Sequence, residues 1–254
     1  MTLTNEHSEL MDTLLDFGET MMFAGGEIGR IEDSLGRLGY VYGAVKTNVF
    51  VITSSIELTL AFPDGSSYTR TRRITTGGST DFEKLRQLNA LSRLCAADRL
   101  PVDELHRRVS AIGNSNMSRL KFYLGGAIAA GSFSLFFGGS FADALMAALF
   151  SLLISFMQEK LAGRCPNKIF FLFVSSLIAG CGICLTARVL PGLQIDKIII
   201  GDIMLLVPGI AITNAVRDTI IGDTISGITK LADSLVWATA LASGFMVAIL
   251  IFAG

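Results

Sequence analysis

The chain has 254 residues, with 21 Lys and Arg against 22 Asp and Glu, and a net charge of −1. This balance excludes a nucleic-acid-binding protein that works through bulk positive charge, and it excludes an acidic disordered chain. Half of the residues are hydrophobic (51 %), 17 % are charged, and the mean hydropathy is +0.55. Such a chain is too apolar for an ordinary soluble domain, so the excess must lie in a membrane or in an unusually large core.

The charges are unevenly distributed along the chain. Residues 1–119 carry 13 Lys and Arg and 15 Asp and Glu, whereas the longer stretch 120–254 carries 8 and 7. This contrast predicts a water-soluble domain over residues 1–118 and a membrane domain over 119–254. The N-terminus has neither the basic region nor the apolar core of a signal peptide, so we expect the soluble domain in the cytoplasm.

The soluble domain is predicted to be of the α+β class. Apolar residues recur at helical spacing before and after the glycines at 25 and 26, and a later stretch is rich in Val, Ile, Thr and Phe, the composition of strands. The expected elements, in chain order, are helices over 8–22 and 28–38, strands near 45–53, 55–62 and 67–74, and two helices that follow Asp81 and Pro101.

Arg70 and Arg72 lie two residues apart and therefore share one face of the third expected strand. We interpret them as a solvated strand edge, where charge also blocks unwanted pairing with other strands. A contact with a lipid headgroup or a partner protein is the alternative.

The sequence contains no pattern typical of a catalytic, metal or cofactor site. His7 and His106 do not lie beside a Cys or carboxylate cluster with metal-ligand spacing. The sequence contains neither of the glycine-rich phosphate-binding motifs GxxxxGK[ST] and GxGxxG. Cys181 and Cys184 form a CxxC inside an apolar run, which favours packing over redox chemistry. We therefore expect no cofactor, no metal and no enzymatic activity.

The membrane domain contains apolar stretches of spanning length. The expected spans lie near 120–139, 141–158, 169–190, 198–216 and 232–253. With a cytoplasmic N-terminus, most Lys and Arg of the loops lie on the inner side, as the positive-inside rule requires. An odd number of spans is unusual for a transporter built from repeats, and indicates a missing half.

The fourth span is the most informative. Pro208 and Gly209 interrupt its middle, and broken helices often build substrate sites in membranes. We expect substrate binding at Pro208, Gly209, Asn214 and Arg217. Arg217 is suited to bind a substrate carboxylate in a bidentate manner, but it is equally suited to reach the inner interface and pair locally with Asp218.

Acidic residues in and after this span are candidates for proton coupling, because an intramembrane acid is functional by default. These candidates are Asp202, Asp218 and Asp223, and Asp143 in the second span is a weaker one. The segment 217–234 alternates polar and apolar residues. It suits either an interfacial helix or the polar lining of a cytoplasmic vestibule.

Three segments carry a resemblance to a known family. They are AGGEIGRIEDSLGRL (24–38), which contains the polar set Glu27, Arg30 and Glu32, then DFEKLRQLNALSRL (81–94), and VPGIAITNAVRDTIIGDTISGITKLADSL (207–235). Together they resemble the threonine/serine exporter family over nearly the whole chain.

The resemblance implies export of small amino acids such as threonine and serine, driven by the proton gradient across a bacterial inner membrane. Members of the family either carry a second membrane half or are split, and this chain is similar to the larger subunit of the split form. The implied partners are a smaller multi-span membrane protein, the small-molecule substrate and the lipid bilayer, in an oligomer without nucleic acid.

Two alternatives remain open at this point. The first is export of a dicarboxylate such as succinate, which the family resemblance also allows. The second is a membrane-anchored cytosolic sensor or hydrolase, in which Glu27, Arg30 and Glu32 are the functional residues. The simplest interpretation of these three is a solvated helix face with pairing between residues 27 and 30.

Overall fold

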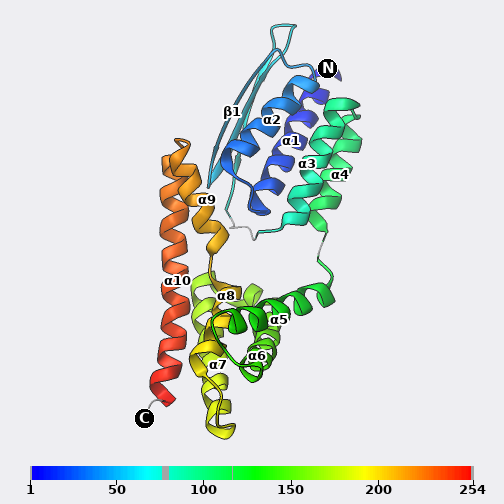
Figure 1. The fold of residues 1–254 in the computed structure, drawn as a ribbon. Helices are drawn as coiled ribbons and strands as arrows, with labels where there is room; N and C mark the ends of the chain where they lie inside the picture. The colour runs from blue at the N-terminus through cyan, green and yellow to red at the C-terminus, as the bar shows by residue number, and fades with distance from the viewer. Residues whose placement is uncertain (1, 76–79, 116, 253–254) are drawn as a thin grey trace. The chain divides into compact units, whose positions relative to one another are not determined.

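The computed structural model describes residues 2–75, 80–115 and 117–252 of the chain (Figure 1). The chain divides into two compact units. Unit 1 comprises Met1–Asn116 with Ile210–Leu231, and unit 2 comprises Met117–Gly209 with Ala232–Gly254. A segment expected in the membrane part of the sequence therefore groups with the N-terminal residues, and each unit is described by itself below.

Unit 1 contains the helices and strands predicted for the N-terminal part, in the predicted order. They are α1 (Thr2–Phe23), α2 (Ile28–Val41), β1 (Lys46–Ile52), β2 (Ser55–Ala61), β3 (Ser67–Arg73), α3 (Phe82–Ala97) and α4 (Val102–Asn114). The strands form an antiparallel sheet in the order β1-β2-β3, with Val49 opposite Leu58 and Leu58 opposite Arg70.

The core of unit 1 lies between the helices and one face of this sheet, where α1 and α2 pack (Figure 1). Alternate residues of β2 point into it, and Ile56, Leu58 and Leu60 are fully buried. The helices supply apolar residues at spacings of three and four, such as Ile31 and Leu35 of α2. Apolar residues recur at every second position in the strand and about every 3.6 positions in the helix, so each element buries one face.

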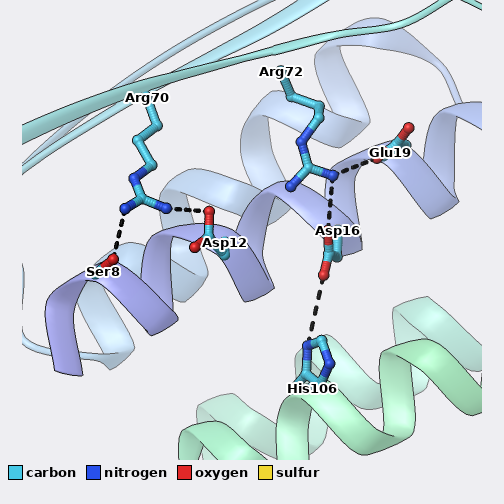
Figure 2. A network of polar contacts seen from close by, with 7 residues as sticks. All are labelled: Ser8, Asp12, Asp16, Glu19, Arg70, Arg72 and His106. Atoms are coloured by element: carbon cyan, nitrogen blue, oxygen red, sulfur yellow. Dashed lines mark hydrogen bonds and ion pairs between the residues drawn. The ribbon is translucent and has the colours of Figure 1, made fainter. Parts of the chain in front are cut away.

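Arg70 and Arg72 lie on an edge strand, as predicted, but the interpretation of their side chains as solvated is wrong. Both side chains extend from β3 to α1 (Figure 2), where Arg70 pairs with Asp12 and donates to Ser8 Oγ at 2.6 Å. Arg72 Nη1 lies 2.8 Å from Asp16 Oδ1 and 2.7 Å from Glu19 Oε2. The acids of α1 recur at spacings of three and four and form one helix face, which the sheet then meets.

Unit 2 is helical. Its elements are α5 (Arg119–Phe136), α6 (Phe141–Lys160), a short 3-10 helix (Ala162–Arg164), α7 (Lys168–Val189), α8 (Ile195–Leu206) and most of α10 (Thr224–Phe252). Within the described residues, three helices are long and apolar enough to cross a membrane: Phe141–Arg164, α7 and α10. The count rises to four if α8 and α9 (Gly209–Ile220) form one bent span. The first of the five expected spans falls on α5, which is not among them.

The predicted helix break at Pro208 and Gly209 is confirmed. Helix α8 ends at Leu206, and α9 begins at Gly209. Pro208 lacks a backbone donor and cannot continue α8. With 12 residues, α8 alone is roughly 18 Å long, shorter than the roughly 30 Å hydrocarbon core of a bilayer.

Asp143 has a structural role in unit 2. Its carboxylate accepts hydrogen bonds from the backbone and hydroxyl of Ser140, both at 2.7 Å, in a capping box that starts α6. It also accepts from the backbone N–H of Gln194 at 2.8 Å. These bonds satisfy the free N–H groups of two segments. This structural role explains why an acid is present at this position, without a role in proton transfer.

Candidate functional site

Two segments singled out in the sequence meet inside unit 1. Arg217 Nη1 of α9 lies 2.7 Å from Oε1 of Glu27, the residue that precedes α2. Asn214 Nδ2, one turn earlier on α9, lies 3.4 Å from the backbone oxygen of Gly25. The polar residues at the start of α2 are thus within reach of the polar face of α9.

The turn between α1 and α2 makes this contact possible. Gly25 has a φ of +82°, a conformation that L side chains rarely adopt. The Asp81 N–H donates to Ala24 O at 3.0 Å, which brings the start of α3 against the turn. The side chain of Asp81 also accepts from Lys84 N and caps α3. Two helix starts therefore converge at the same place.

A pocket of about 320 Å³ opens at this place. Helices α2, α3 and α9 and the turn before α2 line it. The lining residues are Gly25, Gly26, Glu27, Arg30, Phe82, Leu85, Arg86, Asn89, Ile210 and Asn214. We call it the mixed-charge pocket, because its wall contains both a carboxylate and guanidinium groups.

The charged groups of the mixed-charge pocket differ in how they are paired. Glu27 is held by Arg217, and Arg86 donates to both carboxylate oxygens of Glu83 on its own helix. Arg30 has no ion pair with any residue that the structure describes. A guanidinium with unused donors beside a carboxylate can bind a ligand that carries both signs of charge.

Glu32 lies beyond this pocket. Its Oε1 accepts a hydrogen bond from the Val51 N–H at 2.9 Å, which ties α2 to β1. Burial raises the pKa of Glu32, the nearby carboxylates of Asp223 and Asp33 raise it further, and the Val51 bond lowers it. The expected proton-coupling residue Asp223 thus acts electrostatically on a residue of the N-terminal polar set.

The expected local pair of Arg217 with Asp218 is not formed, because successive side chains of a helix point in different directions. Arg217 turns to Glu27, while Asp218 Oδ2 lies 2.7 Å from Lys230 Nζ of α10. Asp218 is fully buried, and among the described residues its Oδ1 has no hydrogen-bond partner. This pair joins α9 to the first turns of α10 within unit 1.

Asp202 lies in unit 2, on α8. Its side chain is fully buried, and neither carboxylate oxygen has a hydrogen-bond partner in the part of the chain that the structure describes.

Pro208 and Gly209 shape the break after α8 and are not lining residues of the mixed-charge pocket. The structure brings together Glu27, Arg30 and Asn214 in one wall, while Arg217 reaches it through Glu27.

Several lining residues were not singled out as site residues in the sequence. The second of the three family-like segments contains Phe82, Leu85, Arg86 and Asn89, and the third contains Ile210. They face the pocket because positions 82, 85, 86 and 89 form one face of α3. The resemblance of residues 81–94 to the family was the only signal in the sequence that pointed to this helix. It did not indicate which face of the helix would line the pocket.

The three segments that build the pocket also lie inside one family match. The model of the ThrE family, described as "Putative threonine/serine exporter", matches residues 12–252. A search of curated proteins and a search of solved structures each return no significant match. The matched range covers nearly the whole chain, including the turn at Gly25, the helix with Asn89 and the polar face of α9. The chain therefore belongs to the threonine/serine exporter family, a family of transporters.

Proposed function

We propose that this chain is the larger subunit of a secondary exporter that binds a small hydroxyl amino acid, threonine or serine, and moves it across the membrane. Family membership supports the substrate class. One structural observation carries the proposal of a binding site: Glu27, Arg30, Asn89 and Asn214 line one pocket of about 320 Å³. The proposed site is thus the mixed-charge pocket of unit 1.

The chemistry of an amino acid matches this wall. The substrate carries an ammonium and a carboxylate on one carbon atom, so its site needs a carboxylate and a cation close together. Glu27 would accept the ammonium, and the guanidinium of Arg30 would bind the carboxylate through two parallel N–H donors. Asn89 and Asn214 can each donate and accept, as a substrate hydroxyl requires.

Arg217 has a different role in this proposal from the one expected in the sequence. It does not line the pocket, and its guanidinium is already bound by Glu27 at 2.7 Å. We assign it the task of holding the Glu27 carboxylate in place. We assign Pro208 and Gly209 an indirect role as well, because they mark the start of α9, the helix that carries Asn214.

For proton coupling we propose Asp202 first, with Asp218 and Asp223 as further candidates. Asp202 is fully buried and its carboxylate lacks a partner among the described residues, so its charge is not compensated by a salt bridge. Asp218 is bound by Lys230, and Asp223 lies near Glu32. An unpaired acid inside a membrane helix is suited to bind and release a proton.

The proposed topology has five spans and a cytoplasmic N-terminus in a bacterial inner membrane. It adds α5 to the three long apolar helices and counts the bent pair α8 and α9 as one span. Arg217 then lies at the inner end of the fourth span, which agrees with its contact to Glu27 in the N-terminal unit. The excess of Lys and Arg in the inner loops supports the same orientation.

A smaller membrane protein is proposed as the partner, as the family resemblance implies, with an oligomeric assembly of both. The family match names threonine and serine, so it gives no support to dicarboxylate export or to a sensor or hydrolase function. We therefore retain amino-acid export alone.

Threonine binding to the purified full-length chain, measured by calorimetry in detergent, tests the site. Glu27→Gln and Arg30→Gln each remove one charge from the pocket and should weaken binding roughly tenfold or more. Glu57→Gln on β2 and Arg73→Gln on β3 are matched controls, because both side chains are exposed and neither lines the pocket. Equal affinity in all variants, or no threonine binding by the unaltered chain, would overturn the proposed site.

Export is tested separately in cells that lack the chain. The cells are loaded with threonine-containing dipeptides, and threonine in the medium is followed by mass spectrometry. This chain, this chain with the smaller membrane partner, and neither are compared. Threonine efflux only with both proteins supports a two-part exporter, whereas efflux that is the same in all three cultures contradicts it.

A further inference from the structure

A second pocket lies next to the mixed-charge pocket, between α2 and α3. Its volume is about 310 Å³. It is lined by Arg30, Ser34 and Arg37 of α2 and by Asn89, Ser92 and Arg93 of α3. The three α2 positions follow at spacings of four and three, and the α3 positions at three and one, so each helix contributes one face. We call this cavity the arginine pocket.

The charge of the arginine pocket has one sign. Three guanidinium groups line it, and no carboxylate is among its lining residues. Within the described part of the chain, none of Arg30, Arg37 and Arg93 has an ion pair or a hydrogen bond through its side chain. Like charges gathered in one cavity repel one another, and an anion placed between them removes this repulsion.

The floor of the pocket provides a second, independent observation. Ser92 is 3 % exposed, and its hydroxyl is buried without a hydrogen-bond partner among the residues described. A buried hydroxyl normally finds a partner, because it loses its bonds to water on burial. Since Ser92 lines the pocket, a bound ligand with an oxygen acceptor would satisfy it.

We propose that the arginine pocket binds the phosphate group of a small molecule. A tetrahedral phosphate presents acceptor oxygens in several directions, so it can engage guanidinium groups from both helices and a serine hydroxyl at once, whereas the two oxygens of a carboxylate lie in one plane. The Asn89 amide can donate a further bond. The same chemistry occurs in a free phosphorylated metabolite and in a phosphomonoester lipid headgroup.

Inorganic phosphate is the probe, and the protein is the full-length chain in a neutral detergent. The phosphate-induced rise in unfolding temperature is measured against sodium chloride of equal ionic strength. Arg37→Gln and Arg93→Gln should each weaken phosphate binding roughly tenfold. Both residues line only the arginine pocket, so threonine binding serves as a readout that these variants leave unchanged.

Arg73→Gln is the matched control, since this exposed arginine lies on β3 and lines neither pocket. Ser92→Ala is a milder variant: it removes a hydroxyl that lacks a partner, so it should keep the unfolding temperature without phosphate and reduce the rise with phosphate. The proposal is overturned if phosphate stabilises all variants equally, or if it stabilises the unaltered chain no more than sodium chloride does.

A lipid arm separates the two sources of the phosphate group. The chain is placed in phosphatidylcholine nanodiscs with or without phosphatidic acid, and phosphate binding is repeated. Loss of phosphate binding in the presence of phosphatidic acid supports a lipid headgroup as the occupant. Unchanged phosphate binding in both nanodiscs supports a soluble phosphorylated molecule.

Discussion

Arg217 Nη1 and Glu27 Oε1 lie 2.7 Å apart, although the two residues are 190 positions apart in the chain. The side chain of Glu27 is 19 % exposed and that of Arg217 is 56 % exposed. This pair fixes α9 to the start of α2, and it holds Glu27, a lining residue of the pocket in which we place the amino acid.

Reversing this pair should show whether the contact holds Glu27 in place. Arg217→Glu brings two carboxylates together and should lower the unfolding temperature and threonine affinity, whereas Glu27→Arg with Arg217→Glu should recover most of the unfolding temperature. Because Arg217 is more than half exposed, we expect a coupling energy of about 0.5–1 kcal/mol. Additive effects of the two single changes, in a double-mutant cycle followed by thermal unfolding, would contradict the pairing.

Glu32 should make the stability of the chain depend on pH. Its pKa is raised above 4.5, first by burial and then by Asp223 and Asp33. A raised pKa in the folded state means that Glu32 favours folding below the unfolded value, and that this contribution is lost as pH rises through the folded pKa. Glu32→Gln keeps an oxygen acceptor for the Val51 N–H and removes the charge.

We therefore expect Glu32→Gln to unfold at a higher temperature than the unaltered chain at neutral and alkaline pH. The difference should shrink as pH falls through the raised pKa toward 4.5. Thermal unfolding across this range measures it, and Glu57→Gln, an exposed carboxylate on β2, should show no such trend. A Glu32→Gln variant that is less stable at high pH would contradict the assignment.

Gly25 should not tolerate a side chain. Gly25→Ala places a Cβ at a φ of +82°, where it would also lie 3.1 Å from Thr80 Oγ1 and 3.2 Å from Thr80 Cα. Gly65→Ala is a matched control, because its φ is +84° and nothing lies within 4 Å of the added atom. Each change costs about 1–2 kcal/mol for the backbone conformation.

Gly25→Ala should lower the unfolding temperature more than Gly65→Ala does, and only Gly25→Ala should weaken threonine binding. The reason is that the turn at Gly25 carries a wall of the mixed-charge pocket. Calorimetric titration of both variants with threonine makes the comparison. Equal affinities would indicate that the turn does not shape the site.

Arg72 should stabilise unit 1 by linking the sheet to α1. Arg72→Gln removes the contacts to Asp16 and Glu19 and leaves two acids on one helix face without their shared cation (Figure 2). Because the side chains of Arg72, Asp16 and Glu19 are about one third exposed, we expect the free energy of unfolding to fall by about 1–2 kcal/mol. Arg73→Gln, one residue later and exposed, should change the unfolding temperature little. A similar loss in both variants would show that the network adds nothing specific.

Asp202 should matter for coupling and not for folding. Asp202→Asn keeps the shape of the side chain, and the carboxylate has no partner among the described residues that the change could break. In proteoliposomes containing the complete exporter, threonine transport should lose its dependence on an imposed pH gradient. Asp196→Asn, at the exposed start of the same helix, is the control. Unchanged gradient dependence in Asp202→Asn would rule out this residue as the proton carrier.

Much of the local structure could be predicted from the sequence. The periodicity of apolar residues placed the helices of the N-terminal part, the content of Val, Ile, Thr and Phe placed its strands, and the residue types at 208 and 209 placed the break between α8 and α9. These features depend on neighbours in the chain, because helical or strand period and the missing donor of proline act over a few residues. Resemblance to the family, carried by three short segments, was confirmed by the match over residues 12–252.

The sequence by itself determined which segments carry polar residues, and the tertiary structure decided which of them meet. Arg217 was expected to hold a substrate or to pair with Asp218, yet it binds Glu27, and Asp218 binds Lys230. Arg70 and Arg72 were expected in solvent, yet they bind acids of α1. Each of these partners comes from another helix or strand, and side-chain spacing along one element does not reveal which face a distant element will cover.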